Sequence, residues 1–185
     1  IRDSRVSRGL GDVYKIQAVA AAKMGADVVM VSKVGDDMFA DNTIRNFQSY
    51  GINTQYVSKV PQTSSGVAPI FVNSTSQNSI LIIKGANEFL KPDDIDKAES
   101  TLVECSLIVL QLEVPLETVY AAIEFGNKHS IPVLLNPAPA VPELDIEYAC
   151  RCDFFVPNET ELEILVNKPV DCLLYTSPSP RDTRE

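Results

Sequence analysis

The sequence lacks an excess of positive charge, long apolar runs and several nucleotide-binding and hydrolase motifs. Its 16 basic residues stand against 25 acidic ones, and the net charge of −9 argues against a nucleic-acid partner or an anionic membrane surface. No apolar run approaches the roughly 20 residues of a membrane span, so no membrane association is expected. The absence of Gly-x-Ser-x-Gly, Walker A and Gly-x-Gly-x-x-Gly motifs removes the hydrolase, P-loop and Rossmann dinucleotide classes that depend on them.

Disulfide and metal patterns are also missing. The four cysteines, Cys105, Cys150, Cys152 and Cys172, form no Cys-x-x-Cys pair and have no histidine at metal-ligand spacing. They fit a chain that is kept reduced, so we expect a cytoplasmic location. The hydrophobic content of 45% is ordinary for a globular protein, and 185 residues suffice for one domain.

The two ends of the chain differ from its middle. Five of the seven arginines lie in residues 1–17 and 172–185, and neither end shows a period of 2 or 3.6 residues. A Ser-Pro-Ser-Pro run at 177–180 is typical of disordered linkers. We interpret both ends as non-native in character, similar to translated sequencing-adapter sequence, and expect them to lack stable tertiary contacts. Residues 18–171 are interpreted as the protein proper.

Strand and helix patterns alternate through this middle part. Short runs rich in β-branched residues precede amphipathic stretches, which predicts an α/β domain with a mostly parallel sheet flanked by helices. In the helix expected at 38–50, Phe39, Ile44 and Phe47 are predicted to face the core. The other expected strands and helices are strands at 27–33, 106–110, 131–135 and 153–156, and helices at 17–24, 92–102, 115–129 and 144–150.

Residues 52–83 interrupt the alternation. They have no helical period, contain many β-branched residues and carry turn signals at 61–66 and 73–78. We expect a small antiparallel sheet there, with hairpin strands at 67–72 and 79–83, that forms a flap beside the main sheet.

Polar residues follow four of the predicted strands. Because the carboxyl ends of parallel strands lie along one edge of a sheet, these groups are expected to converge on a single ligand. They are Gly35-Asp36-Asp37, Glu113, Asn136 and Asn158.

Two of these positions indicate different parts of a ligand. Glu113 lies between Leu112 and Pro115 after an apolar strand, so it is expected to be held rigidly and to accept hydrogen bonds from sugar hydroxyls. A capping or ion-paired glutamate is the alternative. Asn158 and Glu161 share a helix start, where the amide would donate to a phosphate and the carboxylate would orient Mg²⁺ through water. A simple helix N-cap is the alternative there.

Short motifs in residues 17–171 carry a family resemblance. They are Ala18 through Gly25 with Gly35, Gly35-Asp36-Asp37-x-Phe39, Gly66-Val67-Ala68, Phe71-Val72-Asn73, Gly85-Ala86-Asn87, Gln111-Leu112-Glu113, Asn136-Pro137-Ala138-Pro139-Ala140 and Pro157-Asn158-Glu159-Thr160-Glu161. In combination they resemble the ribokinase family of sugar kinases, which also contains fructokinases and adenosine kinase. The resemblance implies a ribokinase-like α/β fold whose residues 52–83 include part of a small β lid.

The same resemblance implies an activity and residue roles. Within the family, the Gln-Leu-Glu and Asn-Pro-Ala-Pro-Ala segments favour transfer of the ATP γ-phosphate to the terminal hydroxyl of D-ribose. Glu113 matches the sugar-binding glutamate, Asn158 the asparagine near the ATP phosphates, and Glu161 the last position of an Asn-x-x-Glu motif tied to Mg²⁺. The implied partners are a sugar and ATP, with K⁺ as an activator and a homodimer formed through the lid in the intact protein.

Parts of the family pattern are absent from the chain. Nothing in residues 8–16 reproduces the Gly-Gly-Lys-Gly-Ala-Asn sugar-binding run, and the Gly-Ala-Gly-Asp anion hole, the catalytic base and the K⁺ and adenine sites are not found. We therefore expect this chain by itself to be inactive as a kinase. Two alternatives stay open: a fructokinase or 2-keto-3-deoxygluconate kinase of the same family, and a non-catalytic sugar-binding module.

Overall fold

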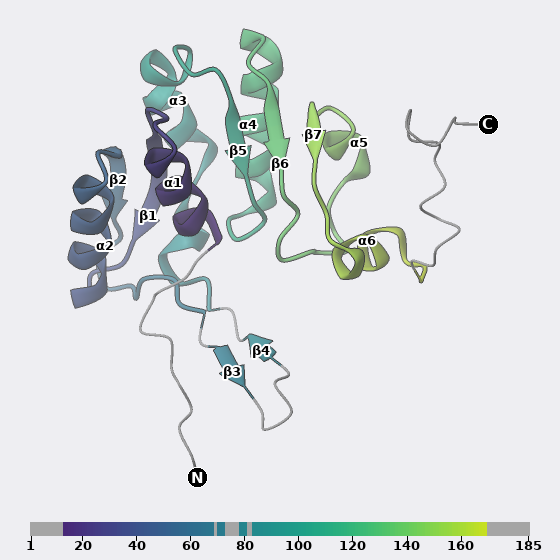
Figure 1. The fold of residues 1–185 in the computed structure, drawn as a ribbon, viewed down its shortest axis with the longest axis horizontal. Coiled ribbons are helices and arrows are strands. Elements are labelled where there is room, and N and C mark those ends of the chain that lie inside the picture. Colours follow the sequence, from purple (N-terminus) through teal and green to yellow (C-terminus); the bar gives the residue numbers. More distant parts are fainter. Residues whose placement is uncertain (1–12, 69, 73–77, 81–82, 170–185) are drawn as a thin grey trace.

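The computed structural model describes residues 13–68, 70–72, 78–80 and 83–169 (Figure 1). Strands alternate with helices along most of the chain, as the sequence predicts. In order, the elements are α1 (Val13–Lys23), β1 (Val29–Val34), α2 (Met38–Ser49), β2 (Asn53–Lys59), β3 (Ile70–Val72), β4 (Asn78–Ile80), the 3₁₀ helix η1 (Gly85–Phe89), α3 (Pro92–Leu102), β5 (Ile108–Leu110), α4 (Leu116–His129), β6 (Val133–Leu135), α5 (Ile146–Ala149), β7 (Phe154–Phe155) and α6 (Glu159–Val166). None of the helices described is both long and apolar enough to cross a lipid bilayer.

Parallel pairing dominates the strands. β1 pairs with β2, and β5, β6 and β7 form a second parallel sheet in that order. The predicted α/β class is therefore confirmed. The prediction that residues 53–59 belong to the small antiparallel sheet is wrong. The crossover through α2 brings the chain back so that β2 runs parallel to β1. β2 is half exposed along its length, and this gives it the alternating pattern that is more common in antiparallel strands.

The antiparallel hairpin occupies the later part of the interruption. Ile70 pairs with Ile80 and Val72 with Asn78, and a bridge between Val67 and Ile83 extends the pairing toward the main body. Figure 1 shows β3 and β4 below the two parallel sheets and apart from them. The predicted hairpin is thus confirmed, while residues 69, 73–77 and 81–82 within it lie outside the described part.

Helices cover both faces of β1. Met30 packs with Ala18 of α1 and Phe47 of α2, whereas the next residue, Val31, packs against a cluster that contains Ile95 of α3 and Phe125 of α4. Successive side chains of a strand point to opposite faces. Hence α1 and α2 lie on one face of this layer, and α3 and α4 lie on the other.

One predicted core position of α2 is wrong. Ala40, Thr43 and Phe47 are buried, at the i, i+3, i+7 spacing of one helix face. Ile44 is half-buried, but Phe39 is 42% exposed. Phe39 lies one residue before Ala40, which places it about 100° around the helix from the buried stripe.

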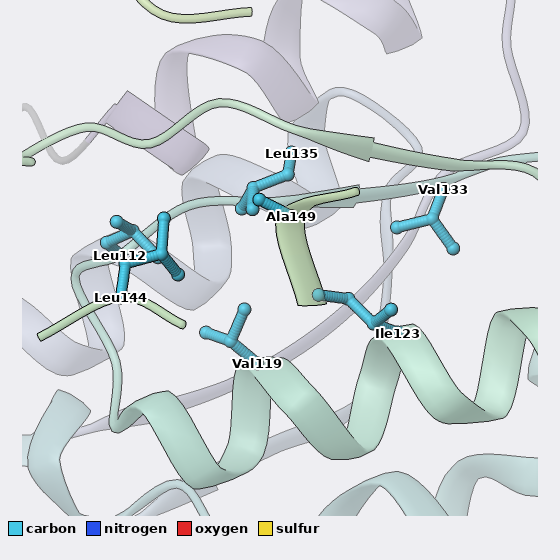
Figure 2. Close-up of a cluster of buried hydrophobic side chains, with 7 residues drawn as sticks. All are labelled: Leu112, Val119, Ile123, Val133, Leu135, Leu144 and Ala149. Atoms are coloured by element: carbon cyan, nitrogen blue, oxygen red, sulfur yellow. The ribbon is translucent and has the colours of Figure 1, made fainter. Parts of the chain in front are cut away.

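The largest apolar core joins α4 and α5 to the β5-β6-β7 sheet. Figure 2 shows Val119 and Ile123 projecting from α4 toward Leu135 and Val133 of β6, with Leu112 and Leu144 closing one end. Burial of each such side chain contributes about 1.5–3 kcal/mol. This cluster fixes the segment that leads from Leu112 into the candidate site.

The first described helix begins before residue 18. α1 starts at Val13, and the Gln17 side chain contacts that of Gln111. α1 ends before Gly25, whose φ of +90° is a conformation that glycine adopts without a Cβ clash. Residues 13–17 therefore extend the folded part beyond the boundary expected from the sequence, while residues 1–12 and 170–185 lie outside the described residues.

Candidate active site

Three strands end in one aligned row. Leu110 of β5 is in register with Leu135 of β6, and Leu135 is in register with Phe155 of β7. Glu113 and Asn158 each follow this row by three residues, and Asn136 follows it by one. Three of the four polar positions predicted from the sequence thus leave this sheet at the same edge, which is where open α/β sheets bind ligands. The fourth, Gly35-Asp36-Asp37, follows β1, which belongs to the other parallel sheet.

Glu113 is fixed in a buried segment after β5. Its side chain is 5% exposed, and Leu112 beside it is 1% exposed. The Leu112 backbone N–H donates to the Ala138 carbonyl (3.0 Å), and the Asn136 N–H donates to the Leu110 carbonyl (2.9 Å). The segments after β5 and β6 are therefore tied together, and the expected rigidity of Glu113 has a structural cause.

A cavity of about 270 Å³ lies beside Glu113. Its walls are mostly apolar and come from α1, β1, α3, β5 and α4, whereas Gln17, Gln111 and Glu113 are among its polar residues. A carboxylate in such surroundings is stabilised by donors such as sugar hydroxyls. Glu113 is therefore a buried carboxylate that lines this space.

Gln17 and Gln111 also line the cavity, although neither was predicted to belong to the site. The Gln111 amide donates to the Gln17 side-chain oxygen, so α1 is joined to the segment that carries Glu113. Gln111 directly follows β5 and stands two residues before Glu113. This position after a predicted strand was the available signal for Gln111. Gln17 had no such signal, because its partner is distant in sequence.

Asn158 and Glu161 bind each other at the start of α6. The Asn158 side-chain oxygen accepts from the Glu161 N–H, and the Glu161 carboxylate accepts from both the backbone N–H and the side-chain amide of Asn158, all at 2.8 Å. This is a capping box, so the alternative from the sequence describes the observed contacts. Asn158 is exposed and Glu161 is half-buried, and neither lines the cavity beside Glu113.

Glu161 supplies the carboxylate oxygens with which this helix start would hold Mg²⁺. Each Glu161 oxygen accepts one hydrogen bond from Asn158 and keeps a further lone pair on a side chain that is half-buried. Mg²⁺ is usually held through one or two carboxylates, water and phosphates rather than by a closed protein cage. Within the part of the chain that the structure describes, no group of three or more His, Cys, Asp or Glu surrounds a metal position. A single carboxylate acting through water is therefore what this helix start offers.

The loop after β1 is joined to the base of the hairpin segment. The Asp37 carboxylate accepts from the Phe39 and Ala40 N–H groups at the start of α2, and also from the Ser65 N–H (2.7 Å) and hydroxyl (2.9 Å). Burial raises the pKa of the Asp37 carboxyl, but the hydrogen bonds from Ser65, Ala40 and Phe39 outweigh it, so its pKa lies below the ordinary value. Gly35 fits the same junction because a Cβ there would meet the Ser65 nitrogen at 2.2 Å.

Comparison with known proteins agrees with this arrangement. The family model described as "pfkB family carbohydrate kinase" matches residues 16–176. A deoxyribokinase from Salmonella typhi is 72% identical over 163 residues, which are 88% of this chain and 53% of that protein. A ribokinase from Schizosaccharomyces pombe is 39% identical over 166 residues, covering 88% of this chain and 52% of that protein. The chain thus spans about half the length of the curated relatives it matches.

Solved structures give the same result for the fold. The structure of Arabidopsis thaliana ribokinase, complexed with ribose and ATP, matches 87% of this chain and 53% of its own chain with a TM-score of 0.77 and 26% identity. A ribokinase from Giardia lamblia matches 84% of this chain with a TM-score of 0.75 and 28% identity. The ribokinase-like α/β fold expected from the sequence is confirmed. The chain belongs to the pfkB family of carbohydrate kinases.

Proposed function

We propose that the whole protein transfers the γ-phosphate of ATP to the terminal hydroxyl of a pentose. The observation that carries this proposal is the 72% identity to a deoxyribokinase across 88% of the chain. The buried Glu113 at the end of β5, beside a cavity, supports it, because a fixed carboxylate is a suitable acceptor for sugar hydroxyls.

The proposal also ranks two pentoses as substrates. The motif resemblance favoured D-ribose, but the similarity to the deoxyribokinase exceeds that to the ribokinase from Schizosaccharomyces pombe. We therefore place 2-deoxy-D-ribose first and D-ribose second. The two sugars differ by the hydroxyl at C2. A site that hydrogen-bonds this hydroxyl would reject the deoxy sugar strongly, whereas a site that leaves it unbonded would discriminate weakly.

The proposed residue roles are divided between binding of the sugar and binding of ATP with Mg²⁺. Glu113 would accept hydrogen bonds from the sugar, and Asn158 would donate its amide to an ATP phosphate. Glu161 would orient Mg²⁺ through water, and the bound metal would neutralise charge on the phosphates. Activation by K⁺, a cytoplasmic location and a homodimer formed through the hairpin β3–β4 also belong to this proposal for the whole protein.

A substrate panel on the full-length protein tests the proposal. ADP release would be measured with ATP, Mg²⁺ and, in turn, 2-deoxyribose, ribose, fructose and 2-keto-3-deoxygluconate. We expect the two pentoses to have the highest kcat/KM, with 2-deoxyribose at least equal to ribose. A preference for fructose or 2-keto-3-deoxygluconate would replace the proposal by another activity of the family. Sugar binding without ADP release from the full-length protein would support a non-catalytic module instead.

A further inference from the structure

Gln111 is a buried amide that directly follows β5. Its side chain is 8% exposed, and burial of an amide is costly unless its polar atoms are hydrogen-bonded. The Gln111 amide donates to the side-chain oxygen of Gln17, which lies in α1 and is 94 positions away in sequence. The bond between the two glutamines therefore satisfies part of an amide that the fold keeps away from water.

Glu113 ends a short segment that is fixed on its β6 side. The Leu110 carbonyl accepts from the Asn136 N–H (2.9 Å), and the Leu112 N–H donates to the Ala138 carbonyl (3.0 Å). The Leu112 side chain also lies in the apolar core of Figure 2. These contacts hold the backbone just before Glu113, but they hold it from one side.

The two glutamines support the same segment from the side of α1. Gln17, Gln111 and Glu113 all line the cavity of about 270 Å³, whose other walls are mostly apolar. Apolar contacts have no preferred direction, whereas a hydrogen bond has a preferred length and angle. The bond between the glutamines therefore restricts the orientation of the Gln111 side chain more closely than apolar packing alone would.

α1 provides a firm attachment for Gln17. The next residue, Ala18, is 7% exposed and packs with Met30 of β1 and Phe47 of α2. Gln17 is half-buried and stands one residue from this cluster, so its backbone is held close to β1. The bond to Gln111 consequently links the sheet that contains β1 to the segment that follows β5.

We propose that Gln17 and Gln111 form a positioning pair for the Glu113 carboxylate. The pair would hold the segment after β5 at a fixed distance from α1, so that Glu113 keeps the place from which it accepts hydrogen bonds from a pentose. This inference rests on the proposed pentose kinase function and adds two residues to its sugar site. A displacement of about 1 Å is enough to impair groups that act by geometry, so a bond two residues away can affect sugar binding.

The pair predicts a specific kinetic effect in the full-length protein. Because it acts through a sugar-binding group, loss of the bond should weaken pentose binding in the ground state and in the transition state alike. Uniform weakening raises KM and leaves kcat unchanged. Binding of ATP should be unaffected, because Asn158 and Glu161 do not line the cavity. A merely structural role would instead lower the melting temperature and change the KM values for both substrates or for neither.

Gln17→Met and Gln111→Met test this expectation. Methionine fills much the same space as glutamine, but its thioether is only a weak acceptor and cannot donate. We expect each change to raise the pentose KM about fivefold or more, with kcat and the KM for ATP unchanged. The control is Ala20→Met, at an exposed position of α1, which should leave all three constants unaltered. Should one of the two glutamine variants fail to fold, the other still tests the bond.

Combined variants show whether the pair acts as a unit and through Glu113. Gln17→Met together with Gln111→Met should be no worse than the more severe single change, since both remove one bond. Addition of Gln17→Met to Glu113→Gln should change the pentose KM by less than about twofold. Additive effects in either combination would overturn the proposal, because they would show that the glutamines act independently of each other or of Glu113.

The same measurements separate this inference from the proposed function. Pentose-dependent ADP release by the parent, with an unchanged pentose KM in both single variants, would contradict the positioning pair alone. Equal rises in the KM for the pentose and for ATP would also overturn the pair. No pentose-dependent ADP release by the parent would contradict the proposed function, and the positioning pair would fall with it.

Discussion

Asp37 and Ser65 are joined by two hydrogen bonds across 28 residues of sequence, one from the Ser65 N–H (2.7 Å) and one from its hydroxyl (2.9 Å). The same carboxylate caps α2 through the Phe39 and Ala40 N–H groups. One side chain therefore joins the loop after β1, the start of a helix and the base of the hairpin segment. The position of the hairpin relative to β1 depends on a group that is charged at neutral pH.

The first prediction concerns the charge of Asp37. Asp37→Asn keeps an acceptor for the cap but loses the charged hydrogen bonds, so it should lower the free energy of unfolding by about 1–2 kcal/mol at pH 7. The folded-state pKa of Asp37 lies below its ordinary value. Its stabilising effect is therefore complete above the unfolded-state pKa near 4 and is lost as the pH falls through the folded-state pKa. Urea unfolding of both proteins between pH 7 and pH 3 should show the difference shrinking below about pH 4.

Ser65→Ala is the matched control for this prediction. It removes the hydroxyl donor and leaves the Asp37 cap of α2 in place, so its effect should be smaller than that of Asp37→Asn. A difference between the parent and Asp37→Asn that stays constant down to pH 3 would show that the charge of Asp37 does not stabilise the junction.

The second prediction separates the two roles of Asn158. Serine is as good an N-cap as asparagine, so Asn158→Ser should preserve the melting temperature of the full-length protein while removing the amide donor. If the amide binds an ATP phosphate, the KM for ATP should rise about tenfold or more. Measurement of Tm and of both KM values on the same variant decides the matter. Unchanged kinetics would leave Asn158 as a helix cap alone.

The third prediction concerns Glu161. Glu161→Gln retains an oxygen for the Asn158 N–H but loses the charge that would orient Mg²⁺. In the full-length protein it should lower kcat more than it changes the KM for the sugar, since charge on the transferring phosphoryl group is stabilised in the transition state. The loss should become smaller as the Mg²⁺ concentration is raised. A rate loss that does not respond to Mg²⁺ would argue against a metal role.

The fourth prediction concerns Glu113. Glu113→Gln preserves the size of this buried side chain, and in the full-length protein it should raise the pentose KM about tenfold or more with little change in the KM for ATP. Glu117→Gln is the control, because Glu117 is an exposed glutamate in the first turn of α4 and its change should leave both constants unaltered. An unchanged pentose KM in Glu113→Gln, with a lowered Tm, would assign Glu113 to structure alone.

The fifth prediction is that the 185-residue chain has no kinase activity. The family's anion hole and catalytic base were not found in its sequence, and removal of even one oxyanion-hole donor costs on the order of 10²–10³ in rate. ADP release with ATP, Mg²⁺ and either pentose should equal that of a no-enzyme control. Sugar-dependent ADP release by a preparation free of host kinases would contradict this.

Local patterns in the sequence were enough to predict most elements in order, apart from β2 and the 3₁₀ helix η1, and the residues that follow β5, β6 and β7. Helix starts and stops depend on groups a few residues apart, as at Gly25 and at Asn158 with Glu161. Buried strands such as β6 have apolar runs that are legible without a partner. For this reason the positions of Glu113, Asn136 and Asn158 after parallel strands were predicted correctly, and motif resemblance supplied the family.

Only the tertiary structure decided which distant segments meet. β2 alternates like an antiparallel strand, but its partner and direction are set by the α2 crossover. The contacts of Gln17 with Gln111 and of Asp37 with Ser65 join residues 94 and 28 positions apart, and no local pattern specifies them. Packing is a property of surfaces brought together by folding. The local sequence therefore determined most of the helices and strands, and the tertiary structure determined which of them pair and pack together.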